Sequence, residues 1–172
     1  MAGDNKLARF ELLVLPHMKA AYNLARWLTR NDHDAEDVVQ EAFLRAFRFF
    51  EGFQGGDGRS WLLAIVRNTC HTWMQRNRTL TLAAEFEEAE AVEPSPEALV
   101  MESIDRESLR RAIEELPAEF REAIVLREME GFSYKEIGTI TGVPVGTVMS
   151  RLARARSRLM AAFGKSGTRG VA

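Results

Sequence analysis

The chain has 172 residues, of which 46% are hydrophobic and 28% charged, and this balance is typical of a globular protein with one or two small domains rather than of a disordered chain. The formal net charge of −2 excludes a uniformly basic or acidic protein. No apolar run is long enough to span a bilayer and the amino terminus lacks a secretory pattern, so we expect a cytoplasmic protein without membrane insertion.

The first predicted helix begins near Leu7. Apolar or small residues recur from there to Leu28 at the three-four spacing of one stripe of an amphipathic helix. Short polar side chains at 31–34 interrupt the pattern, and the acids that follow favour the start of a second helix, which extends to about Phe50. The apolar stripe of this second helix consists of Val39, Phe43, Ala46 and Phe50.

A glycine-rich loop separates the second helix from a third, which we predict from about Ser60 to Arg76. The inward positions of the third helix are Leu62, Ile65 or Val66, Thr69 and Trp73. These three helices are predicted to form an N-terminal domain, residues 1–79.

Residues 80–100 read as a flexible linker. They contain six glutamates and no lysine or arginine, and the prolines at 94 and 96 disfavour helix. A C-terminal domain is therefore predicted at 101–172. Its first helix is predicted to begin inside the linker, at about Glu97, and to end near Glu115.

The C-terminal domain is predicted to end in a helix-turn-helix. Pro117 opens a helix that Gly131 ends, and Ser133 with Glu136 forms a capping box for a short helix. A turn at Gly142 then leads into a last helix over residues 144–163. Because no segment shows sustained alternation of apolar and polar residues, the predicted fold class is all-α: two small helical domains joined by a linker.

The last helix has two distinct faces. The packing face contains Val148, Leu152, Ala155 and Leu159. The opposite face contains Thr147, Ser150, Arg151, Arg154 and Arg158. Side chains near the start of such a helix can reach base edges in the major groove, and arginines further along can neutralise phosphates.

Two further helix faces are candidate binding surfaces. The second helix carries an acidic and polar stripe opposite its core, formed by Asp37, Gln40, Glu41 and Leu44, which suits a basic protein partner or simply solvent. The third helix carries amides, hydroxyls and cations on one side, in a segment with four arginines and no acid. Such groups can bind the bases and backbone of a single strand, or form a plain polar surface.

The sequence resembles the extracytoplasmic-function sigma factors of bacterial RNA polymerase. Residues 34–47 (DAEDVVQEAFLRAF) look like the polymerase-binding helix of their region two, and residues 61–69 (WLLAIVRNT) look like the stretch that opens and reads the minus-10 element. Residues 131–137 (GFSYKEI) and 145–156 (VGTVMSRLARAR) look like region four, which reads the minus-35 element. The resemblance covers nearly all of residues 7–163.

This resemblance implies roles for individual residues. It assigns Asp37, Gln40, Glu41 and Leu44 to core polymerase. It assigns Arg67, Asn68, His71 and Thr72 to minus-10 DNA. It assigns Thr147, Ser150, Arg151 and Arg154 to minus-35 DNA. The implied partners are core RNA polymerase, promoter DNA and an anti-sigma factor, in a stress-response setting, with no catalysis by the chain itself.

Two other function classes remain open to the residues alone. A stand-alone helix-turn-helix regulator would bind duplex DNA without polymerase, usually as a symmetric dimer. A small enzyme would have to use the histidines, Cys70 or the glycine loop, which lacks the lysine and hydroxyl of a phosphate-binding loop. A lone cysteine and scattered histidines have no metal-site spacing, so no metal and no cofactor are expected.

Overall fold

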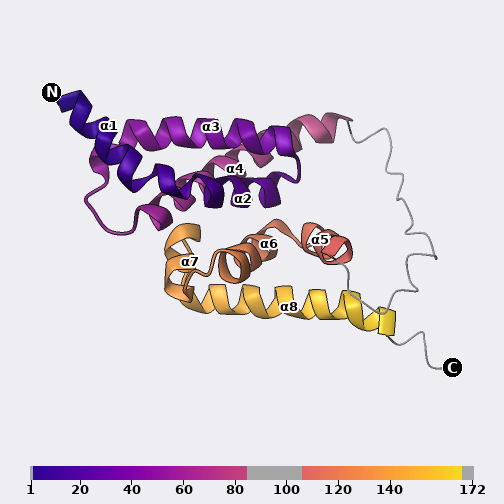
Figure 1. Ribbon diagram of the computed structural model, residues 1–172. Coiled ribbons are helices and arrows are strands. Elements are labelled where there is room, and N and C mark those ends of the chain that lie inside the picture. Colours follow the sequence, from indigo (N-terminus) through magenta and orange to yellow (C-terminus); the bar gives the residue numbers. More distant parts are fainter. Residues whose placement is uncertain (1, 85–105, 168–172) are drawn as a thin grey trace.

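The computed structural model describes residues 2–84 and 106–167, with side chains over 2–78 and 106–163. All regular elements within these ranges are helical, which confirms the predicted all-α class. The N-terminal unit consists of α1 (Ala2–Leu13), α2 (Met18–Thr29), α3 (Asp32–Phe49) and α4 (Gly58–Ala84) (Figure 1). The C-terminal unit consists of α5 (Arg106–Glu114), α6 (Ala118–Ile124), α7 (Tyr134–Thr141) and α8 (Val145–Gly167). No helix in the described ranges is both long and apolar enough to cross a membrane.

The first predicted helix is in fact two helices. A 3-10 turn, η1 (Leu15–His17), separates α1 from α2, with Pro16 in its first turn. The proline ring clashes with the preceding helical turn and supplies no backbone donor, so one continuous helix from Leu7 to Leu28 was a wrong prediction. The apolar periodicity nevertheless continues across the break, because Phe10, Val14 and Leu24 are all buried.

The core of the N-terminal unit lies between α2, α3 and α4. On α3 the fully buried residues are small: Ala35, Val38, Ala42 and Ala46. Val39 and Phe43 of the predicted stripe are only partly buried, so the inward face is rotated relative to that prediction. Small side chains let α3 approach its neighbours closely, and the larger residues sit at the margin. On α4, Leu62, Val66 and Thr69 are buried as predicted.

The predicted linker and third helix differ in part from the structure. α4 continues past Arg76 to Ala84, so residues 80–84 of the predicted linker are helical. Residues 85–100 lie outside the described residues, as do residues 97–105 of the helix expected from Glu97.

The C-terminal unit contains the predicted helix-turn-helix. The Ser133 hydroxyl accepts from the Glu136 backbone N–H at 3.1 Å, and the Glu136 carboxylate accepts from the Ser133 backbone N–H at 2.7 Å, which confirms the capping box. Gly142 ends α7 with a φ of 72°, a conformation that glycine adopts without strain. α8 then packs against α6 and α7 through Val148, Leu152 and Ala155, all buried.

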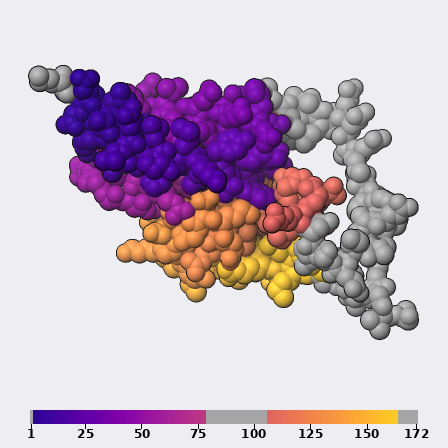
Figure 2. All heavy atoms as spheres, viewed as in Figure 1, coloured from indigo at the N-terminus to yellow at the C-terminus, as the bar shows by residue number. Residues whose placement is uncertain are grey.

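The two units pack directly against each other. α4 lies along α7, and α2 lies along α6. In the space-filling view the orange atoms of the C-terminal unit meet the indigo and magenta atoms of the N-terminal unit along one continuous boundary (Figure 2). The buried residues of both units form one hydrophobic cluster, so the described chain is in a closed arrangement.

Candidate functional site

The four α3 residues assigned to a protein partner lie on one outward face. Gln40 and Asp37 are exposed, and Leu44 has 72% of its surface accessible. Glu41 forms an ion pair with Arg45 one turn later, at 2.6 Å. The face therefore combines an exposed apolar residue with acidic groups around it, an arrangement suited to docking a protein.

The residues assigned to duplex DNA belong to α8, which lies on the side of the molecule away from the N-terminal unit (Figure 1). Ser150 and Arg154 are exposed, and Thr147 is half-buried. Arg151 is more enclosed, with 18% of its side chain accessible and its guanidinium 3.8 Å from the Glu119 carboxylate. The structure thus presents one polar, cationic face at the start of the second helix of the helix-turn-helix.

The four α4 residues assigned to single-stranded DNA are brought together but are not equally accessible. Asn68 is exposed, and its side-chain oxygen accepts from the Arg67 guanidinium at 3.3 Å. The Thr72 hydroxyl donates to the Asn68 backbone oxygen at 3.0 Å. Arg67 and His71, by contrast, are engaged by a carboxylate from the C-terminal unit.

That carboxylate belongs to Glu122 of α6, whose side chain is fully buried. Arg67 Nε lies 3.1 Å from both Glu122 oxygens, and His71 Nε2 lies 2.6 Å from Oε2. Glu122 is not among the functional residues predicted from the sequence. The sequence signal for Glu122 is its position directly before the apolar run 123–126, which favours burial of the carboxylate. A buried carboxylate in turn requires cationic partners.

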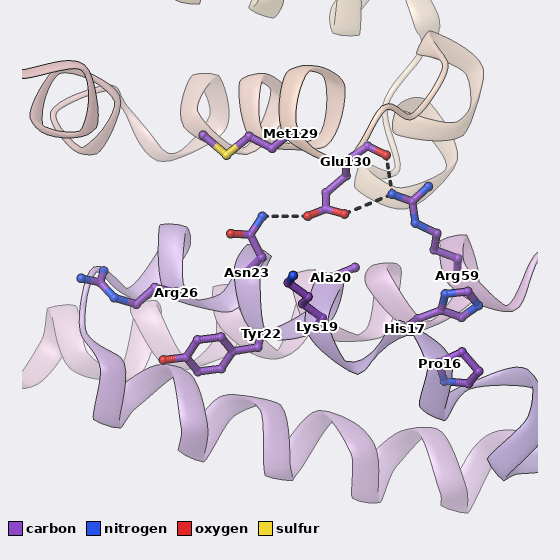
Figure 3. A pocket seen from close by; sticks show the side chains of 10 residues that line it. All are labelled: Pro16, His17, Lys19, Ala20, Tyr22, Asn23, Arg26, Arg59, Met129 and Glu130. Atoms are coloured by element: carbon purple, nitrogen blue, oxygen red, sulfur yellow. Dashed lines mark hydrogen bonds and ion pairs between the residues drawn. The ribbon is translucent and has the colours of Figure 1, made fainter. Parts of the chain in front are cut away.

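A second contact between the units surrounds a pocket of about 590 Å³ between α2, the start of α4 and the end of η4 (Val125–Met129), the π-helical segment that continues α6 (Figure 3). Glu130 points into the gap from the C-terminal unit. One of its oxygens accepts from Asn23 at 2.7 Å, and the other lies 3.1 Å from the Arg59 guanidinium. Arg59 also donates to the Glu130 backbone oxygen and stacks over the buried Phe132 ring at 4.1 Å.

A third contact joins the carboxyl-terminal ends of α2 and α5. Arg26 lies 3.7 Å from the Glu114 carboxylate, and Arg30 donates to the Glu114 backbone oxygen at 3.4 Å. Inside the C-terminal unit, Arg121 donates to the same backbone oxygen at 2.8 Å. Arg30 and Arg121 thus meet a carbonyl group at the end of α5, where a helix leaves its carbonyl groups unpaired.

Cys70 is buried in α4, and burial, assisted by the nearby Glu122 carboxylate, raises the pKa of its thiol to about 12. A thiol that stays protonated is a poor nucleophile and a poor metal ligand. Within residues 2–84 and 106–167 no three histidine, cysteine or acidic side chains lie close enough together to hold a metal ion.

Comparison with known protein families matches both units. The sigma-70 region 2 family matches residues 13–79, and the sigma-70 region 4 family matches residues 106–159. The ECF RNA polymerase sigma factor SigE of Mycolicibacterium smegmatis is 39% identical over 150 residues, which cover 86% of this chain and 58% of that protein. The ECF RNA polymerase sigma-E factor of Escherichia coli is 38% identical over 169 residues, which cover 91% of this chain and 86% of that protein.

Two solved structures are similar in fold. The sigma factor RpoE of Bartonella quintana, in complex with the anti-sigma factor NepR, superposes with a TM-score of 0.75 at 30% identity, covering 91% of this chain and 97% of that one. CnrH, in complex with the cytosolic domain of CnrY, gives a TM-score of 0.62 at 26% identity, covering 91% and 88%.

Proposed function

Because the chain belongs to the extracytoplasmic-function sigma factors of the sigma-70 family, we propose that it binds core RNA polymerase and directs promoter recognition and opening at the start of transcription. The observation that supports this proposal is the presence of both sigma modules in one chain, region 2 before region 4. The chain supplies specificity and the polymerase supplies the catalysis, so we propose no enzymatic activity and a cytoplasmic site of action.

The α3 face is the proposed site for core polymerase. Leu44 supplies apolar contact area, and Asp37, Gln40 and Glu41 supply charge and hydrogen bonds around it. Apolar residues at the centre of an interface contribute most of its affinity, while charges at the rim guide association and select the partner.

The α8 face is the proposed site for minus-35 duplex DNA. Thr147 and Ser150 lie near the start of α8, and we infer that they reach base edges, with Arg151 and Arg154 one turn further along the helix. Guanidinium groups pair with guanine edges or with phosphates, so these arginines supply both specificity and affinity.

Arg67, Asn68, His71 and Thr72 are the proposed minus-10 contacts on α4. Asn68 is open to a flipped base in the closed arrangement. Arg67 and His71 become available to a DNA strand only when Glu122 leaves them.

An anti-sigma factor is a proposed further partner. The proposal is supported by the similarity to RpoE and CnrH, whose structures were solved in complexes with NepR and CnrY. The exposed α3 face offers such a regulator a surface that polymerase also needs.

The test is co-elution with purified core polymerase. The wild-type chain is expected to co-elute with core on gel filtration, and a Gln40→Ala, Glu41→Lys variant is expected to elute alone while retaining its helical circular dichroism spectrum. A matched Glu11→Lys variant, changed on the exposed surface of α1, should still bind core. Failure of the wild-type chain to co-elute would contradict the proposed function.

A further inference from the structure

Positive and negative side chains are segregated between the two sides of the contact between the units. Every ion pair described across it takes its cation from the N-terminal unit and its acid from the C-terminal unit. The acids are Glu114, Glu122 and Glu130, spaced eight residues apart. The cations are Arg26, Arg59 and Arg67, and the His71 ring makes a further contact with Glu122. A surface of this kind on the N-terminal unit is shaped to receive anionic oxygens.

Phosphates and carboxylates present similar oxygens to a guanidinium group, which binds either of them through charge-assisted hydrogen bonds. Glu122 therefore offers Arg67 and His71 what a DNA backbone would offer them. Since both residues belong to the proposed minus-10 surface, the carboxylate and a DNA strand compete for the same donors.

The polar groups at this contact have hydrogen-bonding partners in both the closed and the open arrangement. In the closed form both oxygens of the fully buried Glu122 have partners. If the units separate, Glu122 faces water while Arg67 and His71 can bind DNA. A carboxylate left buried without partners is strongly unfavourable, so release requires α6 to leave α4 rather than a side-chain rotation. The contact thus behaves as a two-state element that a ligand can bias.

The other two proposed binding faces remain accessible in the closed form. Gln40 and Leu44 on α3 are exposed, and so are Ser150 and Arg154 on α8. Polymerase and duplex DNA can therefore dock before the α4 surface is uncovered.

We propose that the C-terminal unit acts as an internal competitor of single-stranded DNA, with Glu122 occupying Arg67 and His71 until the units separate. This inference rests on the proposed function, since it concerns the regulation of the minus-10 surface.

The test measures the distance between spin labels placed at Arg48→Cys on α3 and Ser157→Cys on α8, both exposed positions, in the full chain. The native Cys70 is buried and does not compete for labelling. In a Glu122→Gln variant we expect the distance distribution to shift to longer values. Binding of a short mixed-sequence single-stranded oligonucleotide should tighten by roughly fivefold or more, because the apparent Kd falls as the open fraction rises.

The matched control is Glu128→Gln, which removes the same charge from an exposed site that pairs with Arg156 inside the C-terminal unit. It should change neither the distance nor the affinity. If Glu122→Gln folds by circular dichroism and matches the wild type in both measurements, the proposal is overturned.

A second test needs no change at Glu122. Saturating the labelled chain with the oligonucleotide should lengthen the distance between the labels, and binding at an unchanged distance would overturn the proposal. Transcription with core polymerase tests the proposed function separately. An active sigma factor whose units do not separate on binding DNA would refute the internal competitor alone.

Discussion

Gly138 of α7 lies directly against Val143 in the turn of the helix-turn-helix. A Cβ at position 138 would lie 2.9 Å from the Val143 backbone oxygen and 3.8 Å from the Val145 and Val148 side chains. The approach of α7 to α8 therefore requires a residue without a side chain, and this approach orients the α8 face relative to the rest of the unit.

Gly138→Ala should lower the free energy of unfolding by about 1–3 kcal/mol, because the added methyl group overpacks against backbone that cannot move aside cheaply. Chemical denaturation followed by circular dichroism measures this loss. Gly146→Ala is the matched control, since a Cβ there meets nothing within 4 Å and alanine favours helix. Equal stability of the Gly138 variant and wild type would contradict the close-packing account.

Arg154→Ala should weaken binding to minus-35 duplex DNA by about 1–3 kcal/mol if the guanidinium reads a base edge. Fluorescence anisotropy with specific and scrambled duplexes measures the effect. Arg111→Ala, which removes an exposed arginine from α5, should leave the specific affinity unchanged. An equal loss on both duplexes would instead assign Arg154 to phosphate contact.

Arg59→Lys should lower stability by about 1–2 kcal/mol even though it keeps the charge. Lysine loses the planar stacking on Phe132 and the paired contacts to Glu130. Urea unfolding compares this variant with Arg48→Lys, at an exposed position of α3 that should tolerate the change. If the two variants are equally stable, the Arg59 contact contributes nothing to holding the units together.

The burial of Cys70 predicts that the free energy of unfolding decreases at high pH. Burial raises the pKa of its thiol to about 12 in the folded chain from the ordinary value of 9.0. The thiol's contribution is therefore complete below pH 9 and declines as the pH rises towards 12, because only the unfolded chain releases the proton easily. Urea midpoints of wild type and Cys70→Ala, measured between about pH 8 and pH 11, should converge as the pH rises. If the urea midpoints of the two proteins differ by the same amount at every pH, the effect of burial on the thiol is contradicted.

The faces that point outward could be read from the sequence, because helical periodicity specifies which residues share a side. On α3 the exposed residues Asp37, Gln40 and Leu44 lie on the face that the spacing predicted, and so do the buried residues Val148, Leu152 and Ala155 on α8. Periodicity could not show that Pro16 divides the first helix, since the apolar stripe continues through the turn.

The charged contacts between the units could not be read from the sequence in the same way. Arg67 and Glu122 are 55 positions apart, and the sequence around either residue does not indicate that the other is its partner. An acid directly before the apolar run 123–126 indicates that Glu122 is buried, yet its partners depend on how the two units dock. Long-range pairs of this kind are fixed by tertiary packing alone.

The measurement that tests the central claim most directly is in vitro transcription with purified core polymerase on a promoter library. The account predicts that the chain makes core initiate at a defined subset of templates sharing two sequence elements, and that Gln40→Ala with Glu41→Lys abolishes this activity. Transcripts no more numerous or selective than those from core alone would contradict it. Sequence-specific binding to duplex DNA as a dimer without polymerase would identify a stand-alone regulator instead.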